Sequence, residues 1–85
     1  MDHVDKVSVF PLTNAKDGSC VRIDRLSVGR LALSKLNQMG LREATTVEVL
    51  RHAPFDGPVL VRLLGREVAL GHGVAQKVFV TEILP

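Results

Sequence analysis

Aliphatic and polar side chains alternate in residues 19–26, directly after the turn signal Asp17-Gly18. A period of two places such side chains on opposite faces of a half-buried β-strand. Further segments rich in aliphatic and β-branched residues are bounded by glycine, proline and other turn residues. They predict four more short strands, at residues 45–50, 59–64, 67–70 and 77–83.

One segment has a helical period instead. Residues 28–39 contain no proline, and leucines together with Met39 recur at helical intervals. We expect Ser27 to be the N-cap and Gly40 to be the left-handed residue that closes the helix. A helix this short is unstable alone in water, so it is expected to lie against the sheet.

The two strands around Gly65 are expected to form a hairpin. A type II′ turn at residues 65–66, with glycine at its first central position, fits this spacing. The turn places Leu63 opposite Val68 and Val61 opposite Leu70, so that one face of the hairpin is purely aliphatic.

Five short strands joined by tight turns, in a chain of 85 residues, predict a mostly β fold. The expected architecture is a small, partly open five-stranded barrel with one helix after the first strand. Residues 1–10 are expected to form a lead-in segment and residues 11–85 the single domain. So small a core leaves little room for a deep cleft, which favours a binding protein over an enzyme.

Composition narrows the choice of partner. The net charge is only +2, and the arginines are interleaved with acidic residues rather than gathered on one stretch. Proteins that bind nucleic acid usually need a concentrated basic face, and those that bind single strands also need aromatic rings. The chain has three phenylalanines and no Trp or Tyr, so no nucleic-acid partner is expected.

The N-terminal residues 1–6 do not resemble a signal peptide, and no apolar run is long enough to cross a membrane. The single cysteine suits a reducing compartment. We therefore predict a cytoplasmic protein without direct membrane insertion.

Candidate reactive residues are few and scattered. Cys20 has no nucleophile signature around it, and His3, His52 and His72 show no spacing typical of metal ligands. The glycines at 71 and 73 lack the third glycine of a dinucleotide fingerprint. The sequence thus predicts no catalytic residue, no metal ligand and no cofactor.

Several short motifs, in this order and spacing, resemble the FeoA family from about residue 10 to the end. They are Pro11-Leu12-Thr13, Gly18, Met39-Gly40-Leu41, Val47-Glu48-Val49, Ala53-Pro54-Phe55, Gly57-Pro58, Val68-Ala69-Leu70, Ala75 and Val78-Phe79-Val80. Two loops depart from the family pattern. Arg42-Glu43-Ala44 stands where Pro-Gly is usual, and Asp56-Gly57-Pro58 stands where Gly-Asp-Pro is frequent.

The resemblance implies an SH3-like barrel and a small cytoplasmic accessory protein of ferrous iron uptake. Members of the family are thought to act on the membrane transporter FeoB through its cytosolic G-protein region, without catalysing a reaction. Similar domains occur at the C-terminus of iron-dependent repressors. The alternative is therefore a regulatory SH3-like domain that binds nucleic acid, or a repressor-type domain in metal-dependent transcription control.

Two surfaces are candidates for partner binding. Phe55 lies between Pro54 and Pro58 in a rigid loop, where an exposed ring would be a good anchor. The opposing interpretation is that the ring folds back over one end of the barrel. The second surface is a groove between helix and barrel, formed by Leu33, Met39 and Leu41. The opposing interpretation is that these three side chains pack in the core. A weak homo-oligomer is left open.

Overall fold

The computed structural model describes residues 8–83. Residues 1–7 of the predicted lead-in, including His3, lie outside the described residues. The elements in chain order are β1 (Phe10–Pro11), the 3₁₀ turn η1 (Leu12–Asn14), β2 (Cys20–Leu26), α1 (Arg30–Gln38), β3 (Thr46–His52), β4 (Val59–Leu63), β5 (Arg66–Leu70), α2 (His72–Ala75) and β6 (Val78–Glu82).

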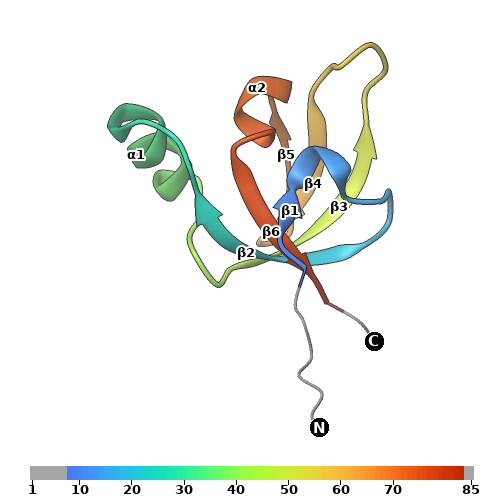
Figure 1. The fold of residues 1–85 in the computed structure, drawn as a ribbon, viewed down its shortest axis with the longest axis horizontal. Helices are drawn as coiled ribbons and strands as arrows, with labels where there is room; N and C mark the ends of the chain where they lie inside the picture. Colours follow the sequence, from blue (N-terminus) through green and yellow to red (C-terminus); the bar gives the residue numbers. More distant parts are fainter. Residues whose placement is uncertain (1–7, 84–85) are drawn as a thin grey trace, which may run out of the picture.

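The strands form one antiparallel sheet in the order β1-β6-β2-β3-β4-β5 (Figure 1). All five predicted strands are present, and α1 follows β2, the first of them, so the mostly β prediction is confirmed. A sixth strand of two residues, β1, pairs with β6 through Phe10 and Val80. Within residues 8–83, the edge strands β1 and β5 do not pair with each other, so the barrel stays open.

Two register irregularities help the sheet to curve. One lies in β2 between Ile23 and Arg25, and the other lies in β3 between Val49 and Arg51. A β-bulge bends its strand and increases the local twist. The inner face of the sheet consequently encloses a core.

That core is aliphatic. Along β2 and β4, buried and more exposed residues alternate, which confirms the predicted period of two. No polar or charged residue among those described is buried. The buried set is Leu12, Ala15, Val21, Ile23, Leu36, Leu41, Val47, Val49, Val59, Val61, Leu63, Leu70, Ala75, Val78 and Val80.

The predicted hairpin turn is wrong by one residue. The central residues are Leu64 and Gly65, so Val61 pairs with Val68 rather than with Leu70. Both central residues have positive φ, 53° and 77°, as a type I′ turn requires, and this turn matches the twist of the flanking strands. The partner of Val61 differs from the predicted one by two residues. Since side chains alternate with a period of two, the same aliphatic side chains still share one face.

The predicted N-cap of the helix is also wrong, whereas its predicted end is confirmed. The Ser27 N–H donates to the Lys77 carbonyl at 2.8 Å, which extends the sheet, and Gly29 is the N-cap instead. At the other end, Gly40 has φ 101° and the Leu41 N–H donates to the Leu36 carbonyl at 2.9 Å. This is a Schellman motif.

We predict that Gly40→Ala lowers the free energy of unfolding by about 1–2 kcal/mol, because an L-residue resists this left-handed φ. The added Cβ would also lie 3.1 Å from Leu64 Cδ1. Gly73→Ala is the matched control, since its Cβ meets nothing within 4 Å and its φ is not positive. Urea denaturation of both variants measures the difference, and equal stabilities would contradict this account of the helix end.

Candidate partner-binding surface

The loop between β3 and β4 extends beyond the sheet (Figure 1). It closes on itself through two main-chain hydrogen bonds. The Ala53 N–H donates to the Pro58 carbonyl at 2.9 Å, and the Gly57 N–H donates to the Pro54 carbonyl at 3.1 Å. The loop is therefore an ordered projection with a defined tip.

Phe55 occupies that tip with 98% of its surface exposed. The ring therefore does not fold back over the barrel, which removes the alternative left open by the sequence. Phe55 has φ 59° and Asp56 has φ 55°. Positive φ is a strained conformation for a bulky residue and costs on the order of 1–3 kcal/mol. The fold thus holds a large apolar ring in water on a strained backbone.

Contacts on both sides fix this tip. A Cβ on Gly57 would lie 2.8 Å from the Ala53 Cβ, so the two ends of the turn approach as closely as glycine allows. Pro54 and Pro58 are exposed and restrict the flanking backbone. Little conformational freedom remains for the loop to lose on binding.

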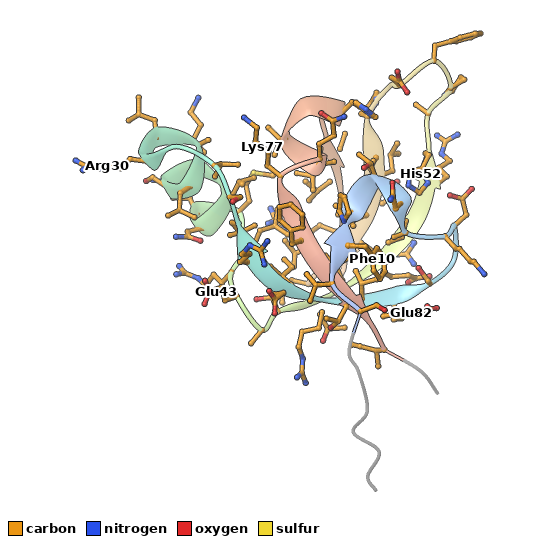
Figure 2. All side chains as sticks on the ribbon, in the orientation of Figure 1. Phe10, Arg30, Glu43, His52, Lys77 and Glu82 are labelled. Carbon is orange, nitrogen blue, oxygen red and sulfur yellow. The ribbon has the colours of Figure 1, made fainter. Side chains whose placement is uncertain are left out.

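Two histidine–aspartate contacts connect the loop to its surroundings. His52, labelled at the end of β3 in Figure 2, has Nδ1 2.7 Å from Oδ1 of Asp17. At the tip, Asp56 Oδ1 lies 4.0 Å from Nε2 of His72 on α2. The first contact joins the base of the loop to the segment before β2, and the second brings the tip toward α2.

An apolar groove of about 210 Å³ lies between α1, β5 and α2. The helix contributes one face with the spacing i, i+3, i+4 and i+7, and Lys35 is the only charged residue in the lining. We call this hollow the α1–β5 groove. It is lined by Ala32, Lys35, Leu36, Met39, Ala69, Leu70, Gly71 and Val74.

The three helix-region residues named from the sequence do not share one surface. Met39 is half-buried and lines the α1–β5 groove. Leu33 lines a separate hollow of about 230 Å³ with Leu26, Asn37, Arg42 and Glu43. Leu41 is fully buried in the core, where it completes the Schellman motif. Met39 and Leu33 therefore lie in two separate hollows, and a partner could contact either one.

Sequence reasoning missed two exposed apolar side chains. Leu31 on α1 is 82% exposed, and Leu64 in the hairpin turn is 76% exposed. The predicted strand at residues 59–64 includes Leu64 because the predicted turn is one residue too late. Its Cδ1 lies beside Gly40, so the hairpin turn packs near the end of α1.

The potential metal ligands among the described residues do not form a cluster. Within residues 8–83, no three His, Cys, Asp or Glu side chains gather closely enough to hold a metal ion. Cys20 is exposed on β2. No helix in this part of the chain has the length and apolar character needed to cross a membrane.

The FeoA domain family matches residues 10–82. The chain belongs to the FeoA domain family. A curated relative of this FeoA domain is the putative Fe(2+) transport protein A of Methanocaldococcus jannaschii. It is 31% identical over 74 residues, which cover 87% of this chain and 88% of the relative.

Solved structures support the same fold. The crystal structure of an iron uptake regulatory protein, FeoA, has a TM-score of 0.78 at 30% identity, covering 89% of this chain and 99% of that one. A manganese-dependent transcriptional repressor has a TM-score of 0.82 at 23% identity, with 94% of this FeoA domain matching 45% of that chain. The expected SH3-like fold and FeoA resemblance are confirmed.

We predict that Phe55→Gly raises the free energy of unfolding by about 1 kcal/mol, because glycine adopts positive φ without a Cβ penalty. Phe55→Ala removes the ring but keeps the strain, so its stability should stay within about 0.5 kcal/mol of wild type, as for other exposed sites. Thermal and urea denaturation distinguish the two. Strong destabilisation by Phe55→Ala would show that the ring packs on the barrel.

Proposed function

We propose that this FeoA domain is a non-catalytic cytoplasmic accessory protein that binds the cytosolic G-protein region of a FeoB-type transporter and modulates ferrous iron transport. The single observation that carries the proposal is the fully exposed Phe55 on a strained, closed turn, in a chain that belongs to the FeoA family. The name of the M. jannaschii relative, an Fe(2+) transport protein, supports ferrous iron transport as the process in which this domain acts.

A partner pocket would gain substantially from this ring. Burying a phenylalanine side chain contributes roughly 1.5–3 kcal/mol. Because the loop is already closed by its own hydrogen bonds, little ordering entropy opposes that gain. Pro54 and Pro58 flank the anchor and form its rim, and they belong to the proposed contact surface.

Met39 in the α1–β5 groove and Leu33 on the other side of α1 remain proposed contacts. Leu41 supports Met39 indirectly, since the buried Leu41 holds the end of the helix in place. Substitutions at Leu41 would therefore test folding rather than binding.

The alternative, a regulatory domain that binds nucleic acid, has less support. Arg62 lies between two carboxylates, 3.1 Å from Glu48 and 3.8 Å from Glu67. Arg25 contacts Asp24 at 3.4 Å and its guanidinium lies 4.4 Å from the centroid of the Phe79 ring. These arginines have acidic or aromatic neighbours instead of forming a concentrated basic face. The likeness to the manganese-dependent repressor shows the fold alone.

We predict that Phe55→Ala weakens binding to the isolated cytosolic region of the FeoB-type transporter from the same organism by at least tenfold. The loss follows from removing a desolvated aromatic anchor, which typically contributes about 2 kcal/mol or more. Isothermal titration calorimetry measures both affinities, and NMR spectra confirm that the variant is folded.

Ile83→Ala is the matched control, because Ile83 is an exposed aliphatic residue just after β6, outside the loop. It should bind like the wild type. Failure of the folded wild-type domain to bind at tens of micromolar would refute the proposed partner. Equal binding by wild type and Phe55→Ala would refute the anchor while leaving the partner.

A further inference from the structure

The strand β5 is a free sheet edge next to the α1–β5 groove. It pairs with β4 on one side only, and no other described strand lies against it. Ala69, Leu70 and Gly71 form the wall of the groove along this edge. An unpaired edge and an apolar hollow thus share the same segment.

The hairpin register identifies which main-chain groups face outward. A two-residue turn makes Leu63 and Arg66 a hydrogen-bonded pair, and such pairs alternate with non-hydrogen-bonded ones along an antiparallel ladder. Glu67 and Ala69 are therefore at the positions whose N–H and C=O point away from β4. Neither has a main-chain partner within residues 8–83.

The ends of this edge are closed. Beyond Ala69, the next outward carbonyl belongs to Gly71, and it accepts from the Ala75 N–H at 2.9 Å at the start of α2. Before Glu67, the Arg66 guanidinium donates to the Met39 carbonyl at 3.2 Å. Four main-chain groups, two donors and two acceptors, thus remain available between fixed ends.

Native proteins usually protect an exposed edge with charges, prolines or a bulge. Here the charged side chains of β5 are engaged elsewhere. Arg66 reaches the end of α1, and Glu67 lies 3.8 Å from Arg62 of β4. The strand has no proline, and its pairing with β4 has no register shift. The edge is open to another strand.

Charge in the groove indicates what kind of segment fits. Lys35 is its only charged lining residue, and the lining includes no acidic side chain. Arg66 adds a second positive charge at the end of α1. A segment with an acidic side chain beside an aliphatic one would complement both the charge and the apolar lining.

We propose that an extended segment of the partner adds a strand to β5. Its main chain bonds to Glu67 and Ala69, an aliphatic side chain enters the α1–β5 groove, and an acidic side chain lies beside Lys35. This is strand addition at a sheet edge, in which main-chain bonds give affinity and alternate side chains give specificity. For the identity of the partner, it rests on the function proposed above.

Hydrogen exchange by NMR tests the proposal, with the cytosolic region of the FeoB-type transporter as probe. In the complex, the amides of Glu67 and Ala69 should exchange at least tenfold more slowly than in the free domain. The amides of Val68 and Leu70 already face β4, so they are internal controls with a smaller change. Binding without slower exchange at Glu67 and Ala69 overturns strand addition while leaving the proposed function.

Other occupants give different results, and each overturns the proposal. A helix in the groove would perturb α1 without protecting the β5 amides. A second copy of this chain would protect those amides when the domain alone is concentrated. Absence of any binding by the wild type would overturn both the proposed function and this mode of contact.

Two substitutions provide a second test. Lys35→Glu should weaken binding at least tenfold, whereas Arg30→Glu, on the same helix but outside the groove lining, should change it less than threefold. Ala69→Pro removes the outward N–H and keeps the bonds to β4, so it should abolish binding, while Ala69→Ser retains it. If Ala69→Pro fails to fold, the Lys35 and Arg30 pair decides. Equal effects of those two charge reversals would overturn the proposal.

Discussion

The inner face of the curved sheet is filled by branched aliphatic side chains, and the rest of the structure depends on that packing. Each fully buried valine or leucine stabilises the fold by roughly 1.5–3 kcal/mol. Among the described residues, no polar or charged residue is buried as a whole, and Nε2 of His52 is a buried polar atom without a hydrogen-bond partner. A filled core of this kind turns attention to the outside of the barrel, and the two hollows described above both lie beside α1.

A well-packed core also allows strain elsewhere. Phe55 and Asp56 both have positive φ, yet the turn is held by its own hydrogen bonds and by the strands that enter and leave it. Strained residues persist only where the surroundings determine their conformation, and they gather at sites of function. An exposed ring on such a turn gives the fold no packing energy in return. The partner contact proposed above would account for both the strain and the exposure.

Alternation along the chain was enough to predict which residues enter the core, but not which residues face one another. A period of two cannot distinguish a turn centred on residues 65–66 from one centred on 64–65, because both place Val61 and Val68 inward. The backbone φ of Leu64 decides between them, and no residue type signals it. Because the predicted turn was one residue too late, the sequence did not predict the exposure of Leu64 or the outward main-chain groups of Glu67 and Ala69.

Other parts of the candidate site depended on contacts between distant segments. The sequence named Met39, but the β5 and α2 walls of its groove come from residues about 30 positions later along the chain. The exposure of Phe55 followed only from the conformation of its turn. The buried position of Leu41 was predictable from the Schellman motif, since Gly40 at C′ directs the next residue back onto the helix.

The strained loop and the free edge lie on either side of one short helix. Asp56 at the loop tip is 4.0 Å from His72, at the start of α2, and Val74 of the same helix lines the α1–β5 groove. A partner that contacts one surface therefore has the other within reach. Two linked contacts can give an affinity that neither gives alone, because the second forms at a high effective concentration.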